Sequence, residues 1–391
     1  MPELASTLDA ALQRVTASAP GIPGVAAVLT DRSATRYAGA AGVRRLGEAA
    51  PMGVDSVCTI SSATKALTCT VCLQLAERGA LDLDRPAKEY APEIDSLEVL
   101  DGFDPEGTPR LRPPKRDITT RMLLLYTAGL GYDFSNEAYA RLVRDGRYPS
   151  VVTATRASLR TPLLFDPGER WEYGTGIDWA GQVVEGVTGR RLGEVMRESV
   201  LGPLGMTSTG FTLSADMRAR LAGVHKRRAD GSLRPLDFEL PSEPEVDMGG
   251  HGLYSTVADY ARFLRMWLDD GRGPDGQAVL RPETVRAAAR GQLSGSGVGV
   301  IRSAIPAQAL DVEWFPGIAK SWAMSFLVND EPAPTGRASG SLAWAGLANV
   351  YYWIDRTTGI AGVWMAQVFP FGDPVAMAGY LDFETRAYAS L

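Results

Sequence analysis

The stretch from residue 59 to residue 78 constrains the fold most, because it is predicted to form a helix that is buried on every side. It reads Thr-Ile-Ser-Ser-Ala-Thr-Lys-Ala-Leu-Thr-Cys-Thr-Val-Cys-Leu-Gln-Leu-Ala-Glu-Arg. Serine is a favourable residue at a helix start, and the following Gly79 is a favourable stop. Between Asp55 and Glu77 the only ordinarily charged side chain is Lys65. A helix that is apolar on nearly every face has to lie inside the protein.

The lone lysine has a serine three residues before it. Ser62 and Lys65 therefore lie on one face of the helix, with Cβ atoms roughly 5–6 Å apart. Burial disfavours the ammonium form and lowers the pKa of a lysine, and a neutral lysine can accept the proton of a serine hydroxyl. The unpaired N–H groups and the dipole of a helix start also stabilise an oxyanion. The stretch therefore predicts a nucleophile, its base and part of an oxyanion hole.

A structural interpretation of the same two residues is that Ser62 caps the helix and Lys65 extends to water. Two observations favour the catalytic interpretation. The chain has five lysines, at positions 65, 88, 115, 226 and 320, and only Lys65 has a serine three residues before it. A strand-like run, residues 56–60, also leads directly into the predicted helix.

Composition places the chain among ordinary globular proteins. Its residues are 45% apolar and 22% charged, as in other globular proteins. A chain of 391 residues is too long for one simple core, which predicts two lobes or domains. The net charge of −6 argues against nucleic acid and acidic membranes as main partners. The first residues form an amphipathic pattern without the features of a signal peptide, and no run reaches the roughly 18 apolar residues of a membrane span. We therefore expect a cytoplasmic protein.

Cysteine and histidine are both scarce. Cys58, Cys69 and Cys72 suit a reducing compartment, and the last two lack a second ligand pair, so core packing is favoured over a zinc or redox site. His225 and His251 are the only histidines, which excludes a His-rich metal site. Any Ser-His-Asp triad has to use one of them. We expect no metal and no cofactor.

Periodicity predicts strands at both ends of the chain and helices in the middle. Strands are expected as a pair within 21–45, at 320–328, and as a long hairpin of 342–354 with 360–369. A surface hairpin or loop is expected at 101–116. Helices are expected near the N-terminus and at about 118–128, 150–159, 178–187, 192–200, 257–270 and 374–390.

Two further positions can carry chemistry. Tyr173 lies in a Gly-rich loop just before a helix, for which Asp178 is the expected N-cap, and a tyrosine near a lysine can relay a proton. The alternative is a packed tyrosine whose hydroxyl is satisfied. The stretch 341–349 is rich in small residues, which lets a strand backbone approach a ligand and donate an N–H group; the alternative is a glycine bulge. A Gly-x-Ser-x-Gly elbow, a P-loop and a Gly-x-Gly-x-x-Gly motif are all absent from the sequence.

Ser62-Ala-Thr-Lys65, Tyr173 and Trp344-Ala-Gly346 stand in the order and approximate spacing found in the serine β-lactamase-like, penicillin-recognising family. The chain most resembles its class C branch and, within it, the family VIII carboxylesterases. The resemblance implies an α/β fold of the α+β type, with an antiparallel sheet flanked by helices and a second, mainly helical lobe. The sheet domain would comprise residues 1–85 and 250–391 and the lobe residues 86–249, with the active site between them.

The resemblance also implies roles for individual residues. Ser62 would be the nucleophile, Lys65 its base and Tyr173 the partner acid and base. The backbone N–H groups of Ser62 and Leu347 would form the oxyanion hole. Trp344, Gly346 and Tyr126 are the expected substrate contacts.

The chain departs from the lactamase pattern at two places. Tyr173 is followed by Gly174 and Thr175 where lactamases have x-Asn, and Trp344-Ala-Gly stands where they have Lys-Thr-Gly or His-x-Gly. Both departures weaken the recognition of penicillin-like anions. We therefore expect a serine carboxylesterase that hydrolyses small, short-acyl esters through an acyl-enzyme. Acyl transfer to an alcohol or amine, weak β-lactam hydrolysis and a non-catalytic binding protein stay open, as does the oligomeric state.

Overall fold

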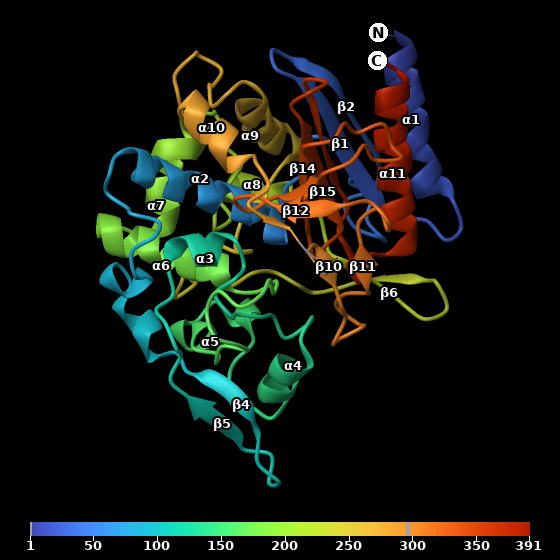
Figure 1. Ribbon diagram of the computed structural model, residues 1–391. Coiled ribbons are helices and arrows are strands. Elements are labelled where there is room, and N and C mark those ends of the chain that lie inside the picture. The colour runs from blue at the N-terminus through green and yellow to red at the C-terminus, as the bar shows by residue number, and fades with distance from the viewer. Residues whose placement is uncertain (1, 295–297) are drawn as a thin grey trace.

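The computed structural model describes residues 2–294 and 298–391, and its centre is an antiparallel sheet (Figure 1). Among these residues the sheet has eight strands in the order β2-β1-β16-β15-β14-β13-β12-β9. Their bounds are β1 Gly24–Asp31, β2 Thr35–Gly42, β9 Leu293–Ser294, β12 Lys320–Trp322, β13 Leu327–Asn329, β14 Ser341–Gly346, β15 Val350–Asp355 and β16 Ile360–Met365. The chain has the β-lactamase/transpeptidase-like fold that the resemblance implied, with the first two strands paired with strands from the last third.

Helices cover both faces of the sheet. Helices α1 (Pro2–Ala17) and α11 (Pro374–Ala389) lie side by side on one face, and α9 (Val257–Leu268) packs on the other (Figure 1). Neighbouring residues of β15 show why: the Tyr352 ring lies 5.2 Å from Tyr260 of α9, and the Trp353 ring lies 6.1 Å from Tyr380 of α11. Successive strand side chains point to opposite faces, so a strand covered on both sides has to be apolar throughout.

Two strand predictions were wrong in detail. The run 320–328 is a hairpin of β12 and β13, because residues 323–326 turn the chain. The run 342–354 is likewise two strands, β14 and β15, joined by a tight turn in which Asn349 has a φ of +57°. Neither of these two turns was predicted from the sequence.

Most of the other helices lie, in the sequence, between the first two strands of the sheet and the strands of the last third. They are α2 Thr64–Glu77, α3 Thr120–Leu124, α4 Glu137–Arg144, α5 Arg156–Leu159, α6 Gly176–Thr188, α7 Leu192–Met196, α8 Ala215–Ala219 and α10 Pro282–Ala288. The predicted helix 150–159 is interrupted at Ala154, which has a φ of +50°. The helix predicted from residue 118 is only one turn long, although Thr119 caps it as expected.

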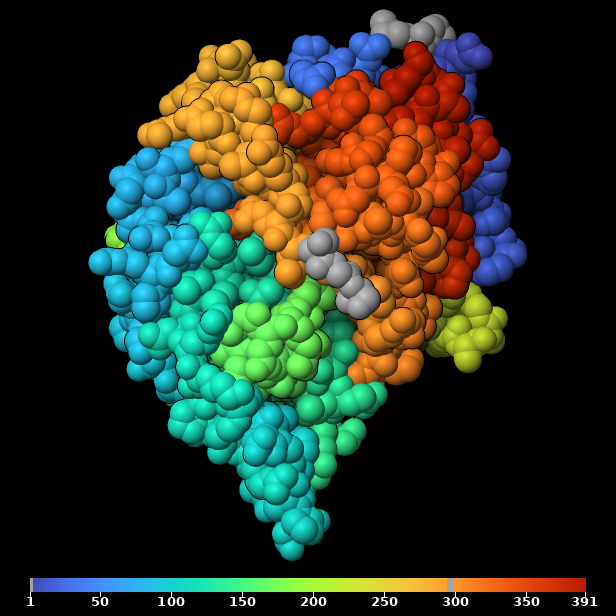
Figure 2. Space-filling model, viewed as in Figure 1, coloured from blue at the N-terminus to red at the C-terminus, as the bar shows by residue number. Residues whose placement is uncertain are grey.

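Short strand pairs connect these parts. They are β3 Cys58–Thr59 with β8 Tyr254–Ser255, β4 Val99–Phe103 with β5 Pro109–Arg112, β10 Val300–Ile301 with β11 Val312–Glu313, and β6 His225–Arg227 between β7 Leu233–Pro235 and β17 Val368–Phe369. The β4–β5 pair is the expected surface hairpin and protrudes from the molecule (Figure 2). The domain boundaries after residues 85 and 249 stay a prediction.

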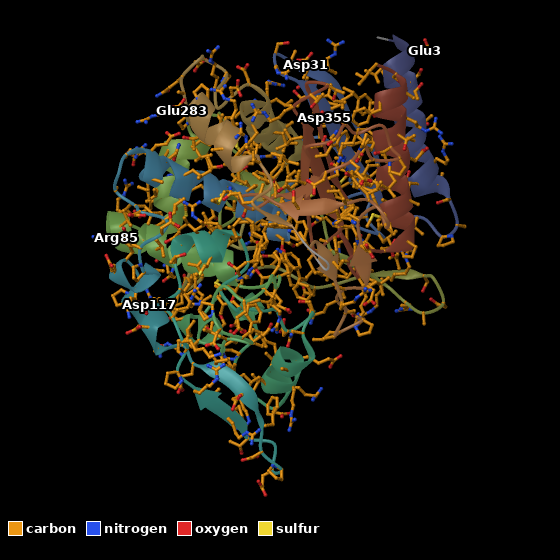
Figure 3. All side chains as sticks on the ribbon, viewed as in Figure 1. Glu3, Asp31, Arg85, Asp117, Glu283 and Asp355 are labelled. Carbon is orange, nitrogen blue, oxygen red and sulfur yellow. The ribbon has the colours of Figure 1, made fainter. Side chains whose placement is uncertain are left out.

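Most charged side chains lie at the periphery. Of those labelled in Figure 3, Glu3, Arg85, Asp117 and Glu283 are exposed. Asp355 is buried instead, because it accepts hydrogen bonds from two N–H groups of the turn between β15 and β16. In the part of the chain that the structure describes, no helix combines the length and apolar character needed to cross a bilayer.

Candidate active site

Ser62 lies in a short 3₁₀ turn, Ser61–Ala63, between β3 and α2. Ser61 has a φ of +45°, a conformation that is unusual for serine and often marks a functional turn. The positions that cap this turn and α2 are Ile60 and Ala63, and neither makes a side-chain capping bond. The interpretation of Ser62 as a helix cap is therefore wrong. Every residue from 64 to 75 of α2 is buried, as the sequence predicted.

Lys65 is completely buried, and its ammonium nitrogen has three oxygen partners. Its Nζ donates to Ser62 Oγ at 3.2 Å, to the Tyr132 hydroxyl at 2.8 Å and to the Gly250 carbonyl at 2.5 Å. Burial lowers the pKa of Lys65 from 10.5 to about 7, although the negative charge of Asp178 acts in the opposite direction. Roughly half of the lysine is uncharged at pH 7, against about one molecule in 3,000 at a pKa of 10.5. Lys65 can therefore serve as a general base for Ser62 near neutral pH.

Asp178 was expected to cap α6 but is instead part of the site. It lies in the first turn of α6, fully buried, where its carboxylate accepts bonds from the Tyr132 hydroxyl at 3.1 Å and the Gly250 N–H at 2.7 Å. Burial acts to raise the pKa of Asp178, but the neighbouring histidine, lysine and backbone N–H together hold it below its ordinary value. A Cβ on Gly250 would lie 2.4 Å from this carboxylate, so glycine is needed for the approach.

Asp178 and Tyr132 are the site residues that sequence reasoning missed. Asp178 is the only charged residue between Glu172 and Glu185, so it carries the same signal that singled out Lys65, a lone charge in an apolar helix. No comparable signal marks Tyr132. It follows a glycine in a loop, and its role depends on a partner 67 residues away in sequence.

Tyr173 lies beside the serine and the lysine, as predicted. Lys65 Nζ is 5.0 Å from the centre of its ring, and Trp344 Nε1 donates to its hydroxyl at 3.2 Å. Burial raises the pKa of Tyr173, and hydrogen bonds with Ser62 and Trp344 oppose that rise. The phenol is therefore protonated at neutral pH and can donate to a departing group.

The end of β14 lies against the turn that carries Ser62. A Cβ on Gly346 would lie 2.2 Å from the Ile60 carbonyl oxygen, so a side chain there is incompatible with this approach. Ser62, Gly346 and Leu347 line a narrow cleft of about 10 Å³, which has room for about one water-sized group. This cleft is where the predicted oxyanion hole would lie, with the Ser62 and Leu347 N–H groups as donors.

The aromatic substrate contacts lie in different places. Trp344 lines the narrow cleft, and its ring centre is 5.0 Å from that of Tyr173. Tyr126 is buried, its ring centre is 5.2 Å from that of Tyr173, and it lines neither this cleft nor the larger cavity described below. The position of Tyr126 therefore favours a role in supporting the Tyr173 ring over a direct contact with the substrate.

Neither histidine replaces Lys65 as the partner of Ser62. His225 is buried, and its Nε2 accepts a bond from the Leu46 N–H at 3.1 Å. His251 lies near Ser62, but its Nδ1 is 3.5 Å from Asp178 Oδ1. Among the residues that the structure describes, Ser62 Oγ accepts a hydrogen bond from Lys65 and none from either histidine.

Ser62 also lines a larger cavity, which shares Phe134 and Leu347 with the narrow cleft. Its volume is about 370 Å³, within the roughly 300–1,000 Å³ typical of small-molecule sites. Its lining is mainly apolar and includes Phe134, Val151, Phe238, Leu240, Leu347 and Phe369. The nucleophile thus lines both a narrow cleft that suits one oxygen atom and a cavity that can hold a sizeable apolar ligand.

The fold and this arrangement define a serine enzyme of the β-lactamase type. The chain belongs to the beta-lactamase family, whose sequence profile matches residues 8–387. Among curated proteins it is 33% identical over 384 residues to the monacolin J acid methylbutanoyltransferase of Aspergillus terreus, covering 94% of this chain and 92% of that protein. It is 32% identical over 340 residues to the lovastatin esterase of Penicillium rubens, covering 84% of each.

Solved structures agree with these relatives. A simvastatin synthase mutant from Aspergillus terreus superposes with a TM-score of 0.86 at 31% identity, covering 98% of this chain and 94% of that one. A family VIII carboxylesterase, the branch that the resemblance named, superposes with a TM-score of 0.70 at 18% identity, covering 100% and 98%, which shows the fold alone. The relatives of 30% identity or more therefore include acyltransferases as well as an esterase.

Proposed function

We propose that this enzyme transfers a short acyl group from an ester or thioester to the hydroxyl of an acceptor, with Ser62 carrying the acyl group in between. In the first step the Ser62 oxygen attacks the donor carbonyl, and the donor leaves as an alcohol or thiol. In the second step the acceptor hydroxyl attacks the acyl-serine, which forms the new ester and restores the Ser62 hydroxyl. Water in place of the acceptor gives hydrolysis, the activity expected from the sequence.

The site provides a path for the proton in each step. Neutral Lys65 accepts the proton of Ser62 during attack, and the Tyr173 phenol donates a proton to the departing oxygen or sulfur. The Lys65 ammonium then returns a proton to Tyr173, so that no net charge accumulates. The second step is the reverse: Tyr173 passes its proton to Lys65 and takes the proton of the attacking acceptor hydroxyl, and the Lys65 ammonium protonates the departing Ser62 oxygen. The negative oxygen of the tetrahedral intermediate would lie in the narrow cleft, between the N–H groups of Ser62 and Leu347. Each such donor is worth about 2.7–4 kcal/mol to the transition state.

The observation that carries the proposal is the large apolar cavity beside the nucleophile. A short acyl group fills only a fraction of it, so space remains for an acceptor that excludes water from the acyl-serine. The similarity to a monacolin J acid methylbutanoyltransferase also supports acyl transfer. We include a cytoplasmic location in the proposal, on the basis of three buried cysteines that are not in disulfides.

Product analysis tests the proposal. The enzyme is given p-nitrophenyl butyrate with and without a bulky apolar alcohol, and the butyrate ester of that alcohol is measured against free butyrate. We expect ester to form in the wild type and neither product in Ser62→Ala. A His251→Gln variant is expected to stay within about tenfold of wild type, because loss of a general base costs about 10²–10⁴-fold.

Esterase activity is the second candidate, favoured by the likeness to lovastatin esterase. Free butyrate as the sole product with every alcohol tested would support it. A non-catalytic binding protein is separated by a fluorophosphonate probe, which is expected to add its mass to Ser62 of the intact protein. An unlabelled wild type would rule out both enzymatic readings.

A further inference from the structure

Two cations face each other across a short hairpin at the large cavity. Lys226 of β6 pairs directly with Arg234 of β7 in an antiparallel register, and both side chains line the cavity that also contains Ser62. Directly opposed residues of an antiparallel pair lie on the same face, and like charges in such a pair repel. Lys226 is partly buried and Arg234 is exposed, so water screens part of this repulsion, and an anion bound beside the two cations would remove the rest.

The protein supplies no such anion among the described residues. Neither Lys226 nor Arg234 forms an ion pair within 4.0 Å there. Arg227, next to Lys226 but on the other side of the strand, is bound to the buried carboxylate of Asp373. Among the described residues, Arg227 is thus neutralised by the protein, whereas Lys226, Arg234 and the exposed Arg228 of the same hairpin are not, and only the first two of these line the cavity.

The rest of the cavity lining has few other charged groups that a ligand would contact. Its other titratable side chains are Tyr132, whose hydroxyl is bonded to Lys65 and Asp178, Asp133, whose carboxylate accepts the Phe134 N–H at 2.9 Å, and His251, which lies beside Asp178. Neither Asp133 nor His251 lies within ion-pair distance of Lys226 or Arg234 in the described structure. The remaining lining is largely apolar, so the wall of this apolar chamber contains both the two cations and the nucleophile.

We propose that this cavity binds an amphiphilic acceptor whose anionic oxygen group is held by Lys226 and Arg234 while its apolar body fills the chamber. The inference rests on the acyl transfer proposed above and names the class of acceptor, a hydroxy acid. Its carboxylate is bound by the two cations, which leaves the hydroxyl at the other end to reach the acyl-serine. The same charges also suit a phosphate on the carrier of the acyl donor, and the two sources give different results in the experiment below.

Binding is tested first without any transfer. Octanoate and octanamide are compared as inhibitors of p-nitrophenyl butyrate hydrolysis, since they differ only in charge. We expect octanoate to inhibit more strongly in the wild type, and its inhibition constant to rise roughly three- to tenfold in Lys226→Gln and in Arg234→Gln. Octanamide inhibition should be unchanged, because the amide carries no charge for the two cations to bind. The matched control is Arg228→Gln, which removes an exposed cation of the same hairpin that does not line the cavity.

Transfer is tested second, with 8-hydroxyoctanoate and 8-hydroxyoctanamide as acceptors. The KM of the acid alone should rise in the two cavity variants. Equal behaviour of acid and amide in the wild type, or equal losses in Arg228→Gln, would overturn the anion site. A rise in KM confined to butyryl-coenzyme A as donor would assign the cations to a donor phosphate and overturn the hydroxy-acid acceptor. If charge-dependent inhibition holds but no alcohol is acylated, the anion site stands and the proposed transfer fails.

Discussion

The perturbed pKa of Lys65 predicts how the rate depends on pH. With a pKa of about 7, roughly 9% of the lysine is neutral at pH 6 and roughly 91% at pH 8. If neutral Lys65 is the base, kcat/KM should rise about tenfold between these values and level off above pH 8, because kcat/KM reports the ionisation of the free enzyme. An unperturbed lysine would give about a hundredfold rise over the same range and no plateau.

The assay is release of butyrate from p-nitrophenyl butyrate between pH 5.5 and 9.5, so that ionisation of nitrophenol does not enter. Two variants assign the titration. Asp178→Asn removes the charge that raises the pKa of Lys65, and the acid limb should therefore move to lower pH. His251→Gln should leave the limb in place. A limb that vanishes with His251, or a rate that climbs steadily through pH 9, would refute the role given to Lys65.

Three other predictions follow from single contacts. The free energy of unfolding of the wild type, compared with that of Lys65→Met, should rise by about 2 kcal/mol from pH 7 to pH 9. The reason is that Lys65 keeps its proton in the unfolded chain but releases it in the folded protein. Urea unfolding of both proteins at the two pH values measures this difference. Gly346→Ala should lower kcat by about 10²–10³-fold, because the Cβ of the alanine displaces β14 from the Ile60 carbonyl and thereby moves an oxyanion donor. A loss of kcat below tenfold would argue against an oxyanion hole at the end of β14. Trp344→Phe should lower kcat/KM about fivefold by removing one hydrogen bond of about 1 kcal/mol to the catalytic tyrosine, whereas Trp322→Phe, which alters the adjacent indole 4.7 Å away, should not.

The catalytic pair could be predicted from the sequence because its geometry is local. Ser62 and Lys65 are one helical turn apart, and a helix presents residues at that spacing on one face whatever surrounds it. The burial of α2 followed from its own composition, since an apolar helix has no face to turn toward water. Tyr173 and the stretch 341–349 were candidates from their local sequence, the resemblance gave them roles, and the structure places Tyr173 and the end of β14 beside that pair.

The errors arose where a local signal has two meanings. An acid near a helix start is usually a cap, and Asp178 was interpreted in that way. The structure turns it inward instead, where the buried lysine and the Gly250 N–H compensate its charge. The strands were also predicted too long, because a tight turn such as that at 323–326, which reads Ala-Met-Ser-Phe, contains no glycine or proline to mark it.

The sequence by itself determined a buried helix with a nucleophile and a base one turn apart, because backbone geometry and apolar periodicity act over a few residues. Only the tertiary structure decided the pKa of that base, which depends on how completely Lys65 is removed from water and on partners from three other segments. It also decided the cavity and the two cations at its wall. Such features arise from contacts between residues far apart in the chain, and no short-range pattern records them.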